Sequence, residues 1–333
     1  MLSADLHSRS CAHLRVAVLI PCYNEAIAIP RVVADFRAAL PEAALYVYDN
    51  NSTDGTAAAA RQAGAVVRRE TLQGKGHVIR RMFADVEADI YVLVDGDDTY
   101  DAAAAPAMIR LLREEGLDMV NGARSSAQSG AYRPGHRLGN AVLSGLVRQI
   151  FGDRFTDLLS GYRVFSRRFV KSFPALATGF ETETEFTVHA LELHMPVGEV
   201  VTRYRERPPG SVSKLNTWRD GLRILASIVA LVKEERPLQF FAGWGLLLLL
   251  ASLALGLPVV SVFLRTGLVP RLPTAVLAMG LTVMAMLAFS VALILDSVTR
   301  GRKELKRLAY LAIPRVAPAE APDSAVAAQP TPR

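Results

Sequence analysis

Three aspartates lie within four consecutive positions of the segment VDGDDTY, residues 94–100. They are Asp95, Asp97 and Asp98, and they follow the apolar run 90–94 directly. Carboxylates this close raise one another's pKa, so a fold keeps them where positive charge compensates. Mg²⁺ or Mn²⁺ takes one or two carboxylates and fills its shell with phosphate oxygens and water. Asp95 and Asp97 therefore form a candidate metal and diphosphate site. The alternative is a solvated loop in which Asp98 or Asp101 caps the next helix.

The residues around these aspartates divide into alternating strand-like and helical segments. Short apolar runs predict strands at 16–20, 45–48, 65–67, 90–94 and 119–120. The segments between them predict helices at 29–40, 53–64, 75–85 and 106–115. This alternation is typical of an α/β layer with a largely parallel sheet, in which ligands bind at the carboxyl ends of the strands.

Polar residues follow four of the predicted strands, so they are expected to meet at one edge of the sheet. They are PCYNE (21–25), DNNSTDGT (49–56), DGDDT (95–99) and NGAR (121–124). A carboxylate at a strand end, such as Asp49, can accept a hydrogen bond from the ring N–H of a nucleobase. Tyr23 offers a flat face on which a base can stack. The stretch 53–56 is interpreted as a turn and helix N-cap.

The sequence QGKG at 73–76 opens a predicted helix. The exposed N–H groups of a helix start, together with Lys75, suit an anion. The segment is not a P-loop, because the first glycine of GxxxxGK[ST] is missing and Gly76 stands where Ser or Thr is required. The first predicted strand–helix turn also lacks GxGxxG, which argues against a dinucleotide-dependent dehydrogenase.

Two long apolar stretches lie near the C-terminus of this chain of 333 residues, which is 51% apolar. Residues 240–264 and 272–295 carry no charge. Because roughly 20 apolar residues span a bilayer core as a helix, we predict transmembrane helices at 237–265 and 272–296.

The net charge of +6 is concentrated next to these spans. Arg and Lys are frequent in 203–236 and 300–307, whereas the loop between the spans holds only Arg265 and Arg271. The positive-inside rule predicts an integral protein of the cytoplasmic membrane with both termini in the cytoplasm. A basic excess also occurs in nucleic-acid-binding proteins, but here anionic headgroups and lipid phosphates are the nearer partners. We therefore expect the membrane, and no nucleic acid, as a partner.

The remaining segments complete the domain prediction. A catalytic domain is expected at 14–213, after an unstructured N-terminus at 1–13. At 214–236 apolar residues recur every three or four positions, which indicates an amphipathic helix that lies in the membrane interface or packs on the domain. A basic segment and an unstructured tail rich in Pro and Ala are expected at 297–333.

Eight short motifs occur in an order that resembles one known family. They are PCYNE, VYDNNSTDGT, QGKGH, VLVDGDDTY, NGAR, DLLSGYRVFSRR, GFETETEF and GSVSKL. Residues 15–235 resemble the family-2 glycosyltransferases of GT-A fold, which have a Rossmann-like nucleotide-sugar-binding domain. Within that group they are similar to the polyprenyl-phosphate glycosyltransferases, such as dolichol-phosphate mannose synthase and the bacterial polyprenyl-phosphate glucosyltransferases. The two predicted spans fit the bacterial branch.

The resemblance implies a nucleotide-sugar donor, Mg²⁺ or Mn²⁺ as cofactor, and a polyprenyl phosphate acceptor. The residues that it assigns to the donor are Pro21, Tyr23, Glu25, Asp49, Asp95, Gly96 and Asp97, and Lys75 joins them as the anion-binding lysine. The implied metal ligands are Asp95 and Asp97. Thr99 is not counted among them, because it replaces the glutamine that completes the metal shell in many dolichol-phosphate mannose synthases. The acceptor-phosphate-binding cations that it implies are Arg124, Arg137, Arg207 and Lys214. It also implies that copies of the chain self-associate.

A lipid phosphate needs little help from a general base, because a phosphate monoester has a second pKa of about 6 and is already ionised at pH 7. We expect an inverting attack on the anomeric carbon, with Asp97 and Arg124 among the catalytic residues. Asp157 is our candidate for orienting the acceptor or acting as base. The alternative is an ordinary ion pair with Arg154 or Arg163. In GFETETEF, two of the three glutamates are expected to be solvated or capping.

The expected product is a polyprenyl-phosphate sugar for cell-envelope glycans or glycoconjugates. Asp49 and Tyr23 suit uracil, and the bacterial branch often uses UDP-glucose. A processive polysaccharide synthase is one alternative, but such enzymes usually carry Gln-x-x-Arg-Trp, and two spans make a poor pore. A non-catalytic membrane-bound nucleotide-sugar sensor is another, against which the Asp95/Asp97 pair and the phosphate-binding cations argue.

Overall fold

A computed structural model of the chain describes residues 14–125, 156–177, 179, 181–208, 233 and 236–316. The chain divides into two compact units, one of residues 1–217 with 307–333 and one of residues 218–306. The first unit contains a mixed β-sheet, and the second contains most of two long apolar helices.

Within the described residues, the first unit is built on a seven-stranded sheet of order β3-β2-β1-β4-β6-β5-β7. The strands are β1 (Val16–Cys22), β2 (Ala44–Asp49), β3 (Val66–Arg69), β4 (Ile90–Leu93), β5 (Met119–Arg124), β6 (Arg163–Ser166) and β7 (Val197–Thr202). β1 pairs in parallel with β2 and β4, as β2 does with β3 and β5 with β7. β6 lies antiparallel between β4 and β5. The predicted largely parallel sheet is confirmed. The antiparallel strand β6 was not predicted, because it lies beyond residues 16–124, where strand-like and helical segments alternate.

The predicted helices of the first half agree with the structure to within a few residues. The helices of the first unit are α1 (Ile29–Ala39), α2 (Thr56–Gln62), α3 (Lys75–Asp85), the 3₁₀ helix η1 (Ala102–Ala104), α4 (Ala105–Glu114), α6 (Arg167–Ser172) and α7 (Thr182–Glu192). α2 begins later than predicted, at Thr56, because Gly55 before it is left-handed with φ of 89°. Glycine adopts that conformation without strain, so 53–55 form the turn.

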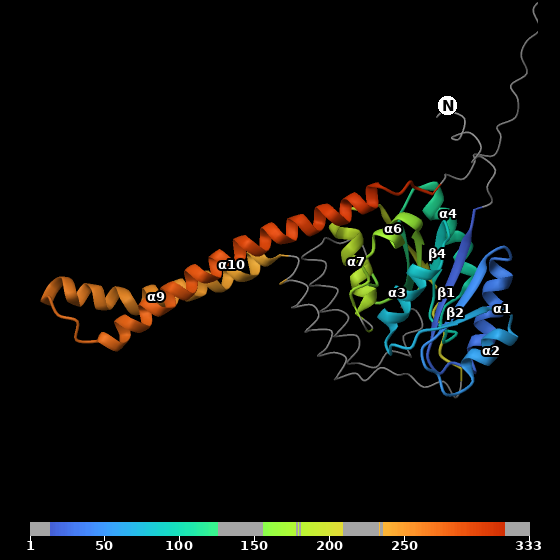
Figure 1. Ribbon diagram of the computed structural model, residues 1–333, viewed down its shortest axis with the longest axis horizontal. Helices are drawn as coiled ribbons and strands as arrows, with labels where there is room; N and C mark the ends of the chain where they lie inside the picture. The colour runs from blue at the N-terminus through green and yellow to red at the C-terminus, as the bar shows by residue number, and fades with distance from the viewer. Residues whose placement is uncertain are drawn as a thin grey trace, which may run out of the picture. The chain divides into compact units, whose positions relative to one another are not determined.

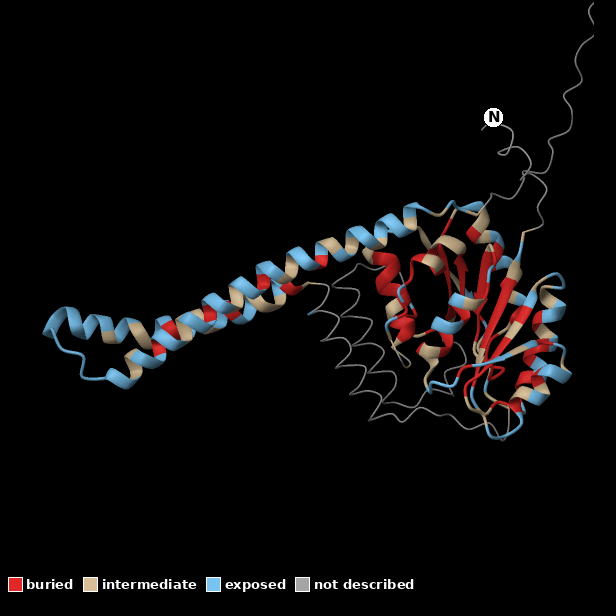
Figure 2. Cartoon of the chain, viewed as in Figure 1, coloured by how far each residue is buried: buried red, intermediate tan, exposed pale blue. Residues whose placement is uncertain are grey.

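Helices cover both faces of the sheet (Figure 1). One face packs against α1 and α4, and its core includes Val18, Ile20, Phe36, Val92 and Met108. On the other face, Phe83 of α3 contacts the rings of Tyr91, Phe165 and Phe186. The central strands β1, β4, β6 and β5 are mostly buried between these layers, as Figure 2 shows in red. Alternate residues of β1 and β4 therefore serve two cores, which makes the strands apolar throughout.

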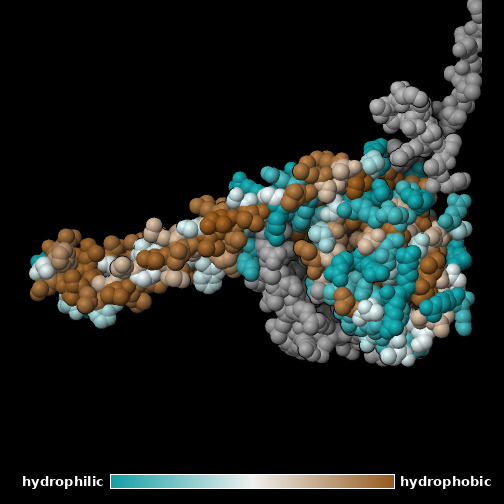
Figure 3. Space-filling view, in the orientation of Figure 1, coloured by the Kyte–Doolittle hydropathy of each residue, from teal (hydrophilic) through white to brown (hydrophobic). Residues whose placement is uncertain are grey.

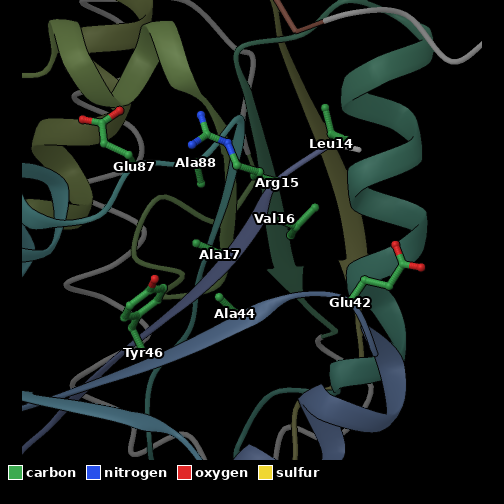
Figure 4. A pocket seen from close by; sticks show the side chains of 9 residues that line it. All are labelled: Leu14, Arg15, Val16, Ala17, Glu42, Ala44, Tyr46, Glu87 and Ala88. Carbon is green, nitrogen blue, oxygen red and sulfur yellow. The ribbon is translucent and has the colours of Figure 1, made fainter. Parts of the chain in front are cut away.

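A hollow lies at the amino ends of β1 and β2 (Figure 4). Its lining includes Arg15, Glu42, Tyr46 and Glu87. Glu87 is already bound by Lys171 at 2.6 Å and by Arg167 at 3.3 Å. The polar segments singled out in the sequence lie at the opposite, carboxyl ends of these strands, so the hollow is not the candidate site.

The second unit contains the two helices that are apolar and long enough to cross a membrane, α9 (Pro237–Thr266) and α10 (Leu272–Leu311). Only 6% and 17% of their most apolar windows are buried, unlike the core helix of a soluble protein. Figure 3 shows hydrophobic residues along much of both helices. The prediction of two membrane-spanning helices fits these elements, and α10 continues helically past residue 296, the predicted end of the second span.

Small residues bring α9 and α10 together. The buried positions of α10 are Ala278, Ala285, Ala292 and Thr299, each seven residues from the next. Those of α9 include Gly245 and Ser252, and Ser252 Oγ donates to the Ala278 carbonyl at 2.7 Å. Small residues let helix backbones approach closely, which is how helices associate in lipid.

Candidate active site

The loops after β1 and β2 are joined at the carboxyl edge of the sheet. Cys22 pairs with Asp49 in the parallel register, so the two loops leave the sheet side by side. The Asn24 N–H donates to Ser52 Oγ at 2.9 Å, and the Glu25 N–H donates to Thr56 Oγ1 at 2.8 Å. Ser52 and Thr56 thus hold the 21–25 loop in place.

Each of the three clustered aspartates has its own cation. Lys75 Nζ lies 2.6 Å from Asp95 Oδ1, and Arg207 Nη2 lies 2.6 Å from Asp97 Oδ2. Asp98, which has a positive φ of 57°, turns away to Arg31, with 3.4 Å between Oδ2 and Nη1. The repulsion evident in the sequence is therefore offset by side chains from three separate elements.

Asp95 and Asp97 are the candidates for holding a divalent cation, because Asp98 turns away to Arg31. Burial raises the pKa of Asp97, and the nearby Asp95 charge raises it further, so added positive charge is favourable there. In the part of the chain that the structure describes, no three His, Cys, Asp or Glu side chains converge as a complete ligand set. A cation held by these two carboxylates would take its remaining ligands from phosphate oxygens and water, as Mg²⁺ does.

Lys75 is buried between two carboxylates. Besides Asp95, its ammonium group donates to Glu183 Oε1 of α7. Burial alone lowers the pKa of Lys75, but the charges of Asp95 and Glu183 outweigh it and raise the pKa above its usual value. Burial raises the pKa of Glu183, and Lys75 opposes that effect. Lys75 is therefore a permanent cation beside the aspartates.

Glu183 and Asn50 are site residues that the sequence reasoning did not select. Asn50 Nδ2 donates to the carbonyls of Glu70 and Leu72 at 3.0 and 2.8 Å, and its Oδ1 accepts from the Gly74 N–H at 2.8 Å. These bonds shape the turn that presents Lys75. Asn50 lies inside a predicted strand-end motif, which is the one signal that could have identified it.

The other two glutamates of GFETETEF, expected to be solvated or capping, instead bind backbone N–H groups of the segment before α7, and no side-chain hydrogen bond caps that helix at Glu181. Glu185 accepts the N–H groups of Leu176 and Ala177 at 2.9 and 3.0 Å. Glu181 accepts the Gly179 N–H at 3.1 Å. Both side chains therefore hold the chain that leads into α7, and of the three glutamates Glu183 is the one that binds Lys75 beside the aspartates.

The residues assigned to a nucleoside surround the ends of β1 and β2. Asp49 is buried, and one oxygen accepts the Ser52 N–H at 3.3 Å. Its other oxygen, Oδ1, is buried with no hydrogen-bond partner among the described residues. Tyr23 is 40% exposed, and Pro21 is partly buried at the end of β1. A buried carboxylate oxygen without a donor is costly unless a ligand supplies one.

Two glycines allow the aspartates to lie where they do. A Cβ on Gly96 would overlap Cys22 Sγ, and a Cβ on Gly161 would overlap the Asp95 carboxylate. Gly161 also donates its N–H to the Tyr100 hydroxyl at 2.9 Å. The segment after residue 156 therefore closes directly against the aspartate motif.

Asp157 binds Arg124, whereas the alternative considered from the sequence paired it with Arg154 or Arg163. Asp157 Oδ2 lies 2.7 Å from Arg124 Nε, and Oδ1 accepts from Nη2 at 2.8 Å. Burial alone raises the pKa of Asp157, but its hydrogen bonds to Arg124 and the Arg124 charge outweigh this and lower it. Arg154 lies outside the described residues.

Arg163 is fully buried beneath this loop and binds its backbone. Its guanidinium donates to the carbonyls of Leu158 and Ser160 at 2.7 and 3.1 Å, and to Thr187 Oγ1 at 3.0 Å. Burial lowers the pKa of Arg163 to about 10. Arg163 thus fixes the loop between Asp157 and Gly161 from below.

The structure brings most of the predicted site residues to one edge of the sheet. Ion pairs and hydrogen bonds connect Glu25, Asp97 and Arg207 in one group, Lys75, Asp95 and Glu183 in a second, and Arg124 with Asp157 in a third. Arg137 and Lys214, the other two predicted phosphate-binding cations, lie outside the described residues, as does nearly all of the predicted amphipathic helix at 214–236.

Comparison with known proteins identifies the family of this chain. Residues 17–173 match the family described as glycosyl transferase family 2. Glycosyltransferase AglJ of Haloferax volcanii is 36% identical over 244 residues, which are 73% of this chain and 78% of that protein. The chain belongs to glycosyl transferase family 2. An uncharacterised protein of Shigella flexneri is 55% identical over 154 residues, which are 46% of this chain and 94% of that protein.

Two further comparisons concern the polyprenyl-phosphate resemblance and the fold. A dolichyl-phosphate hexose transferase of Haloferax volcanii is 29% identical over 222 residues, 66% of this chain and 95% of that protein. Glucosyl-3-phosphoglycerate synthase from Mycobacterium tuberculosis, solved in complex with Mn²⁺ and UDP-glucose, superposes with a TM-score of 0.52 and 25% identity, over 67% of this chain and 79% of that one. The predicted GT-A fold and the predicted glycosyltransferase class are confirmed.

Proposed function

We propose that this glycosyltransferase moves a hexose from a nucleoside diphosphate sugar, UDP-glucose in the first instance, to a polyprenyl phosphate at the cytoplasmic face of the membrane. The observation that carries the proposal is the set of separate cations on Asp95 and Asp97, at the edge of the sheet where Asp49 has a buried oxygen free of any described donor. The product would serve cell-envelope glycans or glycoconjugates.

The choice of donor rests on Asp49. Its Oδ1 can accept the N–H of a uracil ring, which cytosine lacks at the same position. Tyr23, on the neighbouring strand end, is exposed enough to stack on the base. The solved relative bound to UDP-glucose and Mn²⁺ supports the same class of donor and a divalent metal.

Asp95 and Asp97 would hold the divalent metal, and Lys75 adds positive charge beside them. When bound, such a metal neutralises the diphosphate and stabilises the nucleoside diphosphate as it leaves. Lys75 is held by Asp95 and Glu183, so its position is fixed before the donor arrives. A pre-positioned charge costs no reorganisation during the reaction.

The acceptor side consists of cations rather than a free base. Arg124 is oriented by Asp157 through two hydrogen bonds, and its guanidinium carbon lies 5.5 Å from the centre of the Tyr204 ring. Arginine presents a planar fork that matches phosphate oxygens. The lipid phosphate is already anionic, so Arg124 aligns it for inverting attack while Asp157 keeps Arg124 in place.

The membrane part of the proposal rests on α9 and α10 and on the dolichyl-phosphate hexose transferase among the relatives. A lipid acceptor keeps its chain in the bilayer, so an enzyme for it gains from carrying its own membrane helices. The excess of Arg and Lys at 203–236 and 300–307 favours the cytoplasmic side for both. Self-association remains a prediction to be tested by mass measurement in nanodiscs.

The experiment uses the full chain in nanodiscs that contain polyprenyl phosphate, with Mn²⁺ or Mg²⁺ and labelled UDP- and GDP-sugars. We expect metal-dependent label in the organic phase from one donor, with UDP-glucose the strongest. Asp97→Asn should abolish transfer. Asp98→Asn, next to it in the chain but paired with Arg31, is the matched control and should keep most of the activity.

Three other outcomes would contradict the proposal. Donor binding without transfer to lipid would indicate a nucleotide-sugar sensor. Label in a long water-soluble polymer would indicate a processive synthase. Equal activity in Asp97→Asn and the wild type would remove the aspartate pair from the chemistry.

A further inference from the structure

Arg207 bridges two buried carboxylates of the candidate donor site. Its Nη2 lies 2.6 Å from Asp97 Oδ2, and its Nη1 lies 3.5 Å from Glu25 Oε1. The side chains of Asp97 and Glu25 are only 7% and 8% exposed, whereas that of Arg207 is 28% exposed. The guanidinium can therefore leave toward solvent, but the two carboxylates cannot.

The backbone that carries Arg207 is attached to the aspartate motif. Tyr204 forms an antiparallel bridge with Tyr100, and the Arg205 N–H donates to the Thr99 carbonyl at 2.8 Å. Arg205 also pairs with Asp101 at 3.6 Å and with Asp35 at 3.8 Å. The bridge and the backbone hydrogen bond hold the segment 204–205 in place without the Arg205 side chain, so a change at Arg207 can be a change of its side chain alone.

Arg207 holds the Asp97 oxygen, Oδ2, that Thr99 leaves open. The other oxygen of Asp97, Oδ1, accepts the Thr99 hydroxyl at 2.6 Å and the Thr99 N–H at 3.3 Å. A guanidinium and a divalent cation repel each other strongly at contact distances in a buried site. A divalent cation held by Asp97 Oδ2 would therefore compete with Arg207.

We propose that Arg207 is an internal counter-ion that competes with the metal for Asp97 while no donor is bound, and that the diphosphate of the donor draws it away. This inference rests on the proposed function, because it takes the ligand to be a nucleoside diphosphate. The phosphate oxygens offer Arg207 new charged acceptors in exchange for Asp97 and Glu25. Metal alone then binds weakly, and metal and diphosphate each strengthen the binding of the other.

The exchange of Arg207 between Asp97 and the diphosphate affects metal binding when no donor is bound. Without Arg207, Glu25 and Asp97 would both lose the ion pair that they form with it, and Asp97 would attract metal without donor. With Arg207 in place, the metal affinity rises only when a diphosphate is present. The site therefore loads metal together with donor.

The test measures Mn²⁺ binding by electron paramagnetic resonance on the full chain in nanodiscs, with and without UDP. Arg207→Gln should bind Mn²⁺ about tenfold more tightly than the wild type in the absence of UDP. UDP should tighten Mn²⁺ binding in the wild type and much less in Arg207→Gln. Arg207→Lys, which keeps the charge but cannot bridge both carboxylates as a fork, should lie between them.

Arg205→Gln is the matched control. Arg205 lies two residues from Arg207, and its side chain pairs with Asp35 and Asp101 rather than with Asp97. The variant removes the same charge as Arg207→Gln and should leave the Mn²⁺ affinity unchanged. Asp97→Asn should remove the Mn²⁺ signal of this site. The inference fails if Arg207→Gln binds Mn²⁺ no more tightly than the wild type, if Arg205→Gln tightens it equally, or if Asp97→Asn binds normally.

The outcomes separate this inference from the proposed function. A wild type that transfers hexose to lipid while Arg207→Gln leaves Mn²⁺ affinity unchanged overturns the counter-ion role and keeps the function. A wild type that transfers nothing while the Mn²⁺ pattern holds keeps the counter-ion role and overturns the function.

Discussion

Asp157 and Arg124 form a two-point ion pair, with Oδ2 2.7 Å from Nε and Oδ1 2.8 Å from Nη2. Asp157 also accepts the backbone N–H groups of Arg124 and Leu159, at 3.2 and 3.3 Å. Both carboxylate oxygens are thus engaged in holding one arginine and one turn. A carboxylate so placed, with a lowered pKa, is a weak proton acceptor.

Asp157→Asn is expected to act on acceptor binding. The substitution removes the charge that fixes Arg124, so we expect a rise of about tenfold in KM for polyprenyl phosphate and a smaller fall in kcat. The measurement is initial rate against lipid concentration at saturating donor. A general base would behave differently: its loss lowers kcat by roughly 10²–10⁴-fold with little change in KM.

The same pair predicts how stability depends on pH. The folded-state pKa of Asp157 lies below its usual value, which is about 3.9 in an unfolded chain. The pair therefore contributes its full stability above about pH 4 and loses it as the pH falls through the lower, folded-state pKa. In thermal melts from neutral pH downward, the Tm gap between the wild type and Asp157→Asn should stay constant and then narrow below about pH 4. A gap that narrows near neutral pH would contradict the lowered pKa.

Lys75→Met is expected to damage both stability and donor binding. It leaves Asp95 and the buried Glu183 without their shared cation, which costs about 3 kcal/mol for a broken buried pair. The double variant Lys75→Met/Glu183→Gln removes the uncompensated buried charge. It should regain much of the Tm while still binding UDP weakly, as calorimetry would show. If the double variant bound UDP normally, Lys75 would be a structural residue only.

Asp49→Asn is expected to change the choice of base. It replaces a charged acceptor at Oδ1 with an amide, so UDP should bind about tenfold more weakly. The amide can turn to donate to the ring nitrogen of cytosine, so the preference for UDP over CDP should narrow. Competition of both nucleotides against labelled UDP-glucose measures this. Asp54→Asn is the control, because both Asp54 oxygens already accept backbone N–H groups, those of Ala26 and Thr56 at 3.0 Å each. An unchanged preference in Asp49→Asn would remove Asp49 from base recognition.

Local patterns were sufficient for the first half of the fold. Apolar runs such as 16–20 and 90–94 predict strands because burial on both faces requires continuous apolar side chains. The polar segments that follow them, with Asp49, Asp95 and Asp97, then fall at one edge because the carboxyl ends of parallel strands share it. The two uncharged stretches near the C-terminus correspond to α9 and α10 by length and apolarity alone.

Pairings between distant charges were beyond such patterns. Lys75 and Glu183 are 108 positions apart, and Arg207 and Glu25 are 182 apart. Nothing in periodicity tells which of many cations meets which carboxylate, because a charged side chain in a polar segment looks the same whether it is solvated or paired. The order of the strands in the sheet determines which cation lies beside which carboxylate.

The amino-acid sequence by itself therefore determined the α/β layer, the strand-end position of the aspartates and the two apolar helices, because each depends on residues close together in the chain. Only the tertiary structure decided what compensates the aspartates. The insertion of β6 between β4 and β5 places Gly161 against Asp95, and the segment after β7 carries Arg207 to Asp97. Charge compensation acts over a few ångströms in space, so it depends on how distant segments fold together.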